Sequence, residues 1–174
     1  YISARAAAWL DEPLEDLKLI TCHLGNGCSI SAIDHGVAVD TSMGLTPLDG
    51  LMMGTRCGAI DPAIVPFVME HENLTPAEVN DLMNKKSGLL GISGISNDLR
   101  SVRDASEAGN ERAQLAYDMY SNSVKKYIGS YIAVMGGVDA IVLTAGVGEN
   151  CEKMRRMIFA GLQPLGIILD DEKN

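Results

Sequence analysis

The chain has 174 residues, of which 47% are hydrophobic and 21% are charged, and its formal net charge is -9. This length allows one domain with a sizeable core but not two comfortable ones, so we expect residues 1–174 to form a single domain. The excess of negative charge argues against nucleic acid or an anionic membrane surface as a partner, because both would repel the protein.

Two further features bear on where the protein works. The opening residues 1–10 read as the interior of a helix, without an initiator methionine, an N-cap or a signal peptide, so we expect the chain to be part of a longer polypeptide. No apolar run approaches the roughly 20 residues that span a bilayer. The four cysteines, Cys22, Cys28, Cys57 and Cys151, have neither metal-ligand nor disulfide spacing. A reducing, cytoplasmic setting with no resident metal site is therefore expected.

The first part of the chain predicts a three-stranded antiparallel meander. Short runs rich in β-branched and apolar residues occupy 17–22, 28–33 and 37–40. The turns between them, at 25–27 and 34–36, have hairpin length. The 17–22 run is almost continuously apolar, so we expect it to be a central strand covered on both faces.

The middle of the chain changes to helical periodicity. Three N-cap residues each precede a proline, which predicts three helix starts: Thr46-Pro47, Asp61-Pro62 and Thr75-Pro76. Glu78 completes a capping box with Thr75, and Gly88 is typical of a helix end. A further helix is expected to begin near Ser96 or Asn97, and a long one to occupy 111–135.

The last part of the chain predicts a buried strand over 139–144, an amphipathic helix over 151–161 and a final strand over 166–169. The resulting order is a meander, several helices, then strand, helix, strand. A meander followed by crossover-linked strands favours an α/β fold with a mixed sheet and helices on both faces.

Two glycine-rich turns each follow a strand, His23-Leu24-Gly25-Asn26-Gly27 and Thr144 to Asn150. Glycine allows backbone N–H groups to approach an anion closely, so two such turns on neighbouring strands predict a cradle for a polyphosphate. A tight hairpin explains the first turn equally well. The second nearly matches the dinucleotide fingerprint GxGxxG, with Asp170 about 20 residues on, but Cys151 replaces the third glycine.

Four polar residues could carry chemistry. Arg56, in a glycine-bearing loop, offers a permanently charged fork suited to phosphoryl oxygens, or it forms a surface salt bridge. Asp98 and Arg100 could bind a ribose hydroxyl or an adenine edge, or Asn97 or Asp98 could cap a helix. His23 could donate to an oxyanion, or it is a core histidine. His35 and His71 are expected to face solvent.

These segments together resemble the acetate kinase family. The motifs that carry the resemblance are HLGNG at 23–27, VDTSMGLTPLDGLMMGTRCGAIDP at 39–62, SGISNDLR at 93–100 and TAGVGEN at 144–150. The resemblance runs essentially from end to end, and the 39–62 block is its most specific part. It implies a ribonuclease H-like, actin-like ATPase domain with βββαβαβ order, here the second domain of such a kinase.

The resemblance also implies a reaction, the reversible transfer of a phosphoryl group from ATP to acetate, giving acetyl phosphate and ADP. Arg56 and His23 would be catalytic. The nucleotide would contact three groups of residues: His23, Leu24, Gly25, Asn26 and Gly27; Asp98, Leu99 and Arg100; and Gly146, Val147, Gly148, Glu149 and Asn150. The carboxylates for Mg²⁺, the acetate pocket and an N-terminal domain are expected outside this chain, which would then be inactive alone. A homodimer through this domain is also implied.

Alternatives stay open. Propionate and butyrate kinases share the motifs, and an actin-like or Hsp70-like assembly module or a nicotinamide-dependent oxidoreductase are further hypotheses. The family usually has serine and aspartate where this chain has Cys57 and Ala59, so the orientation of Arg56 is expected to differ.

Overall fold

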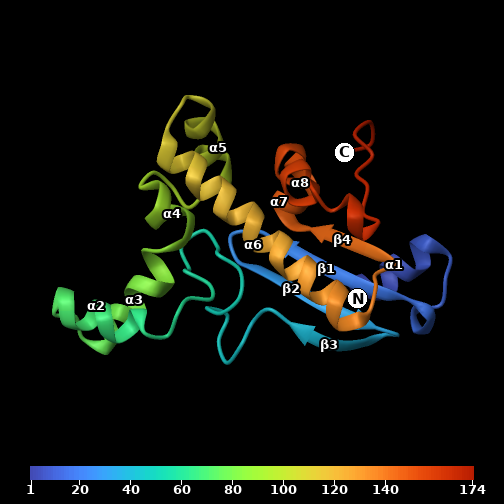
Figure 1. Ribbon diagram of the computed structural model, residues 1–174, viewed down its shortest axis with the longest axis horizontal. Coiled ribbons are helices and arrows are strands. Elements are labelled where there is room, and N and C mark those ends of the chain that lie inside the picture. The colour runs from blue at the N-terminus through green and yellow to red at the C-terminus, as the bar shows by residue number, and fades with distance from the viewer. The chain divides into compact units, whose positions relative to one another are not determined.

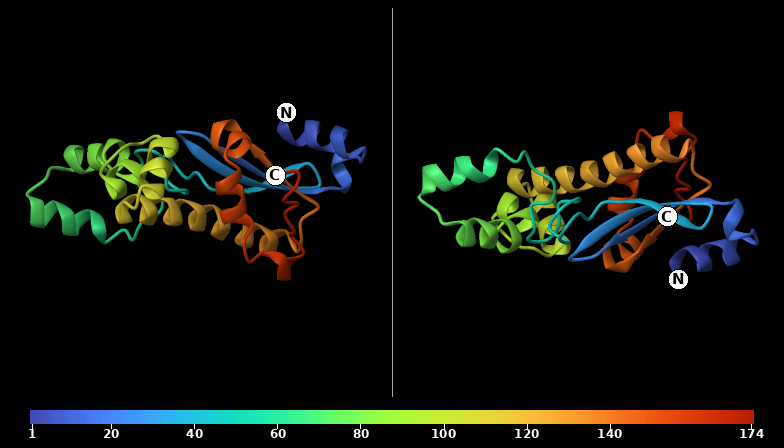
Figure 2. Two further views of the ribbon diagram at one scale, coloured as in Figure 1. Left: turned by 90° about the horizontal axis from the view of Figure 1, so that it is seen from above. Right: turned by 90° about the horizontal axis from the view of Figure 1, so that it is seen from below.

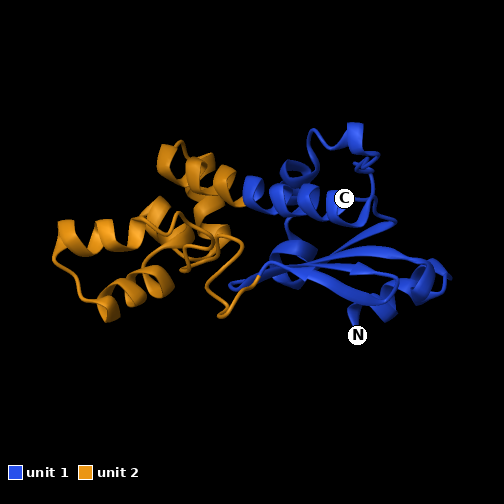
Figure 3. Ribbon diagram, turned by 60° about the horizontal axis from the view of Figure 1, so that its bottom comes forward, with its two compact units in different colours: residues 1–42, 121–174 blue, residues 43–120 orange.

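The computed structural model describes all 174 residues, which divide into two compact units (Figure 3). Unit 1 comprises Tyr1–Ser42 and Ser121–Asn174, and unit 2 comprises Met43–Tyr120. The long helix α6, Glu111–Met135, contributes residues to both. The expectation that residues 1–174 act as a single domain stays a prediction.

Unit 1 is built on a four-stranded mixed sheet (Figure 1). Its strands are β1 Lys18–Leu24, β2 Cys28–Asp34, β3 Val37–Thr41 and β4 Ala140–Thr144, in the order β3-β2-β1-β4. β1 pairs antiparallel with β2 and parallel with β4. The predicted meander, the central place of β1 and the α/β class with a mixed sheet flanked by helices are therefore confirmed.

Both faces of β1 are covered, because alternate side chains of a strand point to opposite faces. Ile20, Cys22 and Leu24 point to one face and are fully buried. Leu19 points to the other and belongs to a cluster with Ala7 of α1, Ile2–Leu10. Figure 2 shows α1 on one side of the sheet and residues 121–135 of α6 on the other. The sheet thus forms a middle layer between helices.

The end of unit 1 differs from prediction. Unit 1 also contains η1 Leu14–Asp16, α7 Ala145–Asn150, α8 Glu152–Phe159 and η2 Gln163–Leu165. The strand predicted over 166–169 is wrong, so the observed order lacks its last β. Gly166 has a left-handed conformation, and the Ile167 N–H donates back to Leu162 O at 3.3 Å instead of joining the sheet. Ile168 is 79% exposed, so this apolar run is not buried as a strand of the sheet would be.

Unit 2 is helical. Its helices are α2 Ile64–Glu72, α3 Pro76–Lys85, α4 Gly88–Ser93, α5 Leu99–Glu107 and the N-terminal part of α6. The Thr75 capping box is present, with both reciprocal hydrogen bonds, and α6 has the predicted bounds. None of the helices, α6 included, combines the length and apolar character needed to cross a membrane.

Four predicted helix boundaries in unit 2 differ from the structure. No helix starts at Thr46-Pro47: the Thr46 hydroxyl accepts from Leu48 N as a cap would, but Gly50, with φ 95°, turns the chain before a helix can form. The Asp61 carboxylate accepts from Ala63 N, as a cap does, but Ile64 N and Val65 N donate to carbonyls three residues back, so the α-helix itself begins only at Ile64. Gly88 does not end a helix; it is the first residue of α4, after α3 has ended at Lys85. The helix expected near Ser96 begins at Leu99, with Asp98 as its N-cap.

Candidate functional site

The two glycine-rich segments lie side by side in unit 1. β1 and β4 run parallel, with His23 opposite Thr144, so both strands end at the same edge of the sheet. A Cβ built on Gly25 would lie 3.6 Å from the Cβ of Ala145. The carboxyl edge of a sheet is where ligands of α/β folds commonly bind. The juxtaposition predicted from the sequence is therefore present.

The second glycine-rich segment is a short helix, α7, and not an open turn. It starts with Ala145 in the left-handed region at φ 65°, a conformation that costs a non-glycine residue about 1–2 kcal/mol. The Ala145 N–H donates to Glu149 Oε1 at 2.9 Å. At the other end, Arg155 Nη1 donates to the carbonyls of Gly148 and Glu149 at 3.1 and 2.8 Å. Glu149 therefore caps the start of α7, and an anion arriving there competes with its carboxylate.

Two glycines of α7 have different environments. A Cβ on Gly148 would lie 3.3 Å from two atoms of Leu143, so this glycine allows α7 to pack closely on the end of β4. A Cβ on Gly146 would meet nothing within 4 Å, and Gly146 has no positive φ. Neither packing nor backbone conformation requires a glycine at position 146. Open space over exposed backbone is what a bound group needs.

The first glycine-rich turn is held by hydrogen bonds between its own residues. The Gly25 N–H donates to Gly27 O at 3.2 Å, and the Cys28 thiol donates to Gly25 O at 3.2 Å. Leu24 is fully buried, so its side chain serves the core, whereas Asn26 is exposed. His23 is also exposed, and its Nδ1 lies 3.2 Å from Thr144 Oγ1. The interpretation of His23 as a core histidine is therefore wrong.

Arg56, in unit 2, has a half-buried side chain without an ionic partner. Its Nη1 donates to Pro47 O at 3.3 Å and contacts Met53 Sδ at 3.5 Å, and it forms no ion pair. The alternative of a surface salt bridge is thus wrong. A guanidinium fixed by neutral groups keeps its charge available for an anion.

The loop before Arg56 is fixed by the start of α4. Three N–H groups donate to its carbonyls: Ser87 to Thr55 at 2.9 Å, Leu89 to Met53 at 2.9 Å and Leu90 to Gly54 at 3.0 Å. Gly88 lies so close that a Cβ would be 2.2 Å from Met53 O and 2.8 Å from Arg56 O. This role of Gly88 is not recognisable from the sequence, because a glycine after two lysines is also typical of a helix end.

Cys57 and Ala59 follow Arg56 closely in the chain, and the structure describes the surroundings of both. The Cys57 N–H donates to Met83 O at 3.0 Å, and its thiol donates to Gly58 O at 3.2 Å. Burial raises the pKa of the Cys57 thiol, so the neutral form is favoured. Ala59 is exposed and supplies no carboxylate. Consequently no charged group at 57 or 59 orients Arg56.

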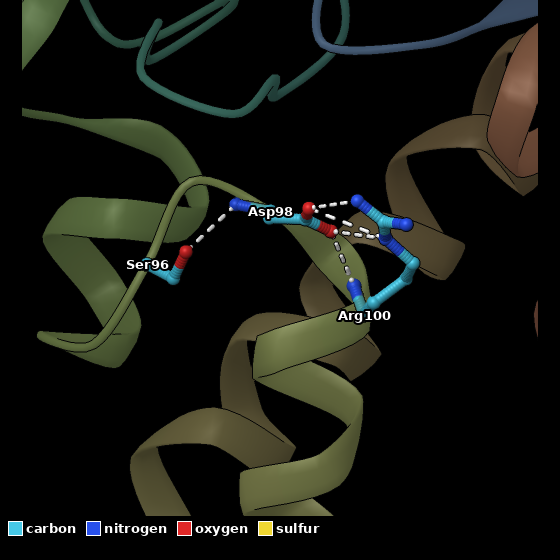
Figure 4. Close-up of polar contacts among 3 residues, drawn as sticks. All are labelled: Ser96, Asp98 and Arg100. Atoms are coloured by element: carbon cyan, nitrogen blue, oxygen red, sulfur yellow. Dashed lines mark hydrogen bonds and ion pairs between the residues drawn. The ribbon is translucent and has the colours of Figure 1, made fainter.

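Asp98 and Arg100 bind each other (Figure 4). Arg100 Nη2 lies 2.6 Å from Asp98 Oδ2, and the Arg100 N–H donates to Asp98 Oδ1 at 2.9 Å, which makes Asp98 the N-cap of α5. The Ser96 hydroxyl accepts from Asp98 N at 3.0 Å. Hydrogen bonds from Arg100 lower the pKa of Asp98 to about 2. The capping alternative is confirmed, Leu99 between them is buried, and a contact with ribose stays a prediction.

The structure thus brings the ends of β1 and β4 together in unit 1, with His23 beside Thr144, and fixes Arg56 and Asp98 separately within unit 2. That Asn26, Arg56 and Gly146 line one cleft stays a prediction. No group of three or more His, Cys, Asp or Glu side chains in the chain could hold a metal ion. The dinucleotide hypothesis lacks support, because α7 and α8 lead to no further strand.

Comparison with known proteins agrees with the resemblance. The model of the acetokinase family matches residues 1–174. Acetate kinase of Heliobacterium modesticaldum is 63% identical over 174 residues, all of this chain and 44% of the relative, and that of Methanosarcina barkeri is 59% identical, with 43% of the relative covered. The chain therefore spans less than half the length of the curated relatives it matches.

Solved structures show the same fold. The acetate kinase of Porphyromonas gingivalis matches 99% of this chain and 43% of its own, with TM-score 0.97 and 50% identity. A propionate kinase from Francisella tularensis matches 99% of this chain and 44% of its own, with TM-score 0.93 and 43% identity. The mixed sheet with flanking helices is therefore shared with these kinases, and the chain belongs to the acetokinase family.

Proposed function

We propose that the intact protein is an acetate kinase, which transfers the γ-phosphoryl group of ATP reversibly to acetate. One observation carries the proposal. The end of β1 and the start of α7 lie side by side at the carboxyl edge of the sheet, and the space over Gly146 is open. Two backbone segments of this kind can cradle a polyphosphate in an otherwise acidic protein.

The proposed step is an in-line displacement. A carboxylate oxygen of acetate attacks the γ-phosphorus, the bond from that phosphorus to the β,γ-bridging oxygen breaks, and ADP leaves with the electron pair. The transition state resembles metaphosphate, with charge spread over three equatorial oxygens. Arg56, which has no ionic partner, would meet that charge, and His23 and Asn26 would hold neighbouring phosphate oxygens.

The nucleotide's other contacts are proposed from the same elements. Gly146 would lie beneath the adenosine, with Val147 to Asn150 behind it, and Asp98 and Arg100 would face the nucleoside. Mg²⁺ usually keeps several waters and binds through phosphates plus one or two carboxylates. We therefore propose that it arrives with ATP and finds its carboxylates outside this chain; when bound, it neutralises charge on the phosphates.

A propionate kinase is the second candidate. The structure of one from Francisella tularensis matches this chain nearly as well as that of an acetate kinase does. Acyl-phosphate formation by the intact protein with acetate and with propionate decides between them. Higher kcat/KM for acetate supports the first proposal, and the reverse order supports the second. No turnover with either acid refutes both.

The proposed role of residues 1–174 is to supply the nucleotide platform, within a cytoplasmic homodimer that includes an N-terminal domain. The 174-residue chain alone should bind ADP weakly and produce no acetyl phosphate, because the chain spans only 43–44% of its relatives. Calorimetric titration with ADP and an acetyl-phosphate assay test this. Robust Mg-dependent turnover by the chain alone would refute the claim that essential groups lie outside it.

A further inference from the structure

Thr144, the last residue of β4, contacts the imidazole of His23 at the end of β1. The two residues are partners in the parallel register of these strands, so their side chains lie on the same face of the sheet at its carboxyl edge (Figure 1). Thr144 Oγ1 lies 3.2 Å from His23 Nδ1. Thr144 is half-buried, whereas His23 is exposed. A short, stiff side chain therefore fixes one nitrogen of a ring that otherwise lies in solvent.

The other ring nitrogen lies beside the first glycine-rich turn. His23 Nε2 is 3.8 Å from the position that a Cβ on Gly25 would occupy. The χ2 angle of a histidine is broad and roughly two-fold, so a rotation of about 180° exchanges the ring nitrogens with ring carbons. The contact with Thr144 selects one of the two orientations, because a carbon in place of Nδ1 would lose the hydrogen bond. The selected orientation keeps Nε2 beside the turn to which the proposed function assigns phosphate.

His23 has a second hydroxyl neighbour in the sheet. In the antiparallel pairing of β1 with β2, Ser29 lies opposite His23, on the side away from β4. The imidazole bonds to Thr144 and not to Ser29. The ring is thus turned towards β4, where α7 begins, and the two hydroxyl groups provide a matched pair of positions for an experiment.

The surroundings of the Thr144 hydroxyl indicate which way its hydrogen bond runs. A hydroxyl donates one hydrogen bond and accepts up to two. Thr144 is the N-cap of α7, but its side chain accepts from no N–H group of that helix. His23 Nδ1 is therefore the partner to which the hydroxyl can give its proton. A neutral ring that accepts at Nδ1 carries its own proton on Nε2, and an N–H there can donate to a phosphate oxygen, whereas a bare nitrogen would repel it.

We propose that Thr144 is a positioning residue for phosphoryl transfer, which holds neutral His23 as the Nε2–H tautomer with that N–H group beside the Gly25 turn. The inference rests on the proposed function and deepens it, since it names the group that allows His23 to donate to phosphate without gaining a proton. When the ring is protonated, the same hydroxyl accepts from Nδ1–H, so the orientation of the ring is unchanged.

The first experiment detects the tautomer without reference to activity. Nitrogen-15 NMR of the intact protein with labelled histidine, at alkaline pH where imidazole is neutral, separates a protonated ring nitrogen from a bare one. A His23→Gln variant assigns the resonances. We expect the wild type to carry its proton on Nε2, Thr144→Ser to retain this state, and Thr144→Val to give a mixture of both tautomers. A wild-type proton on Nδ1, or a Thr144→Val spectrum equal to that of the wild type, overturns the inference.

Kinetics of the intact protein distinguish positioning from a loss of packing. Thr144→Val conserves the shape of the side chain but removes the hydroxyl, so it should lower kcat about 10-fold with little change in the KM for acetate, and Thr144→Ser should restore most of the loss. The matched control, Ser29→Ala, removes the hydroxyl on the other side of His23 and should leave kcat unchanged. In a His23→Gln background, Thr144→Val should cause no further loss, because the two residues act as one unit.

Three kinetic results would overturn the inference: a Thr144→Val kcat equal to that of the wild type, an equal loss in Ser29→Ala, or additive losses in the double variant. A wild type without acyl-phosphate formation refutes the proposed function and with it the role of Thr144 in the reaction. The NMR spectra distinguish that failure from a Thr144 side chain that does not hold the ring, because they report the tautomer of His23 whether or not the protein turns over.

Discussion

Gly88→Ala should displace the loop that carries Arg56 from the start of α4. Gly88 has φ 62°, and a Cβ there would lie 2.2 Å from Met53 O. The Met53 carbonyl would have to retreat by roughly 1 Å to reach an ordinary carbon–oxygen separation. That carbonyl also accepts the Leu89 N–H at 2.9 Å, so its displacement disturbs the hydrogen bonds that join the loop to α4.

The expected loss of stability has two parts. A left-handed conformation costs alanine about 1–2 kcal/mol more than glycine, and overpacking of a close contact costs about 1–3 kcal/mol. The free energy of unfolding should therefore fall by about 2–5 kcal/mol. A displacement of roughly 1 Å at a catalytic group can reduce kcat about 100-fold, which we expect in the intact protein if Arg56 acts in phosphoryl transfer.

Gly109→Ala is the matched control. Gly109 lies in the same unit, has φ 91° and has nothing within 4 Å of a built Cβ, so its substitution carries the conformational cost without the clash. Urea unfolding of both variants measures the difference. If Gly88→Ala destabilises no more than Gly109→Ala, the reasoning that Gly88 holds the Arg56 loop by close contact is refuted.

Three further predictions concern single residues. Arg56→Lys should lower kcat of the intact protein by about 1,000-fold with little change in ADP affinity by calorimetry, because lysine lacks the planar fork; an unchanged kcat contradicts the proposed clamp. Gly146→Ala should weaken ADP binding and leave the free energy of unfolding unchanged or raised. Gly148→Ala, whose Cβ would lie 3.3 Å from Leu143, should lower the free energy of unfolding. Equal effects of the two variants on unfolding would contradict the packing argument. The pKa of Asp98 falls from 3.8 to about 2 on folding, so its charge stabilises the protein above pH 3.8 and this contribution disappears as the pH falls towards 2. Asp98→Asn keeps a capping side chain and should lose stability relative to wild type at neutral pH but not at pH 2, as urea unfolding at both values would show; a difference independent of pH excludes the ionised pair as its source.

Local signals account for what the sequence determined. The meander, the capping box at Thr75 and the bounds of α6 follow from periodicity and turn chemistry, which act between neighbours in the chain. The two glycine-rich segments were recognisable for the same reason. Their juxtaposition could also be expected, because parallel neighbouring strands end at one edge of a sheet, and β1 and β4 do so.

Other features depended on contacts between residues far apart in sequence. Gly88 begins α4 because its N-terminal N–H groups find carbonyls in the 53–55 segment, a partner that no local pattern reveals. The run 166–169 has the composition of a strand, but Ile167 bonds back to Leu162 instead. Ile64 and Phe67 of α2 have the spacing of a helix face, yet they are 44% and 57% exposed, since apolar spacing shows which residues share a face but not whether anything covers it. Periodicity and caps are properties of a segment, whereas burial and carbonyl partners belong to its neighbours in space, and only the tertiary structure decided those.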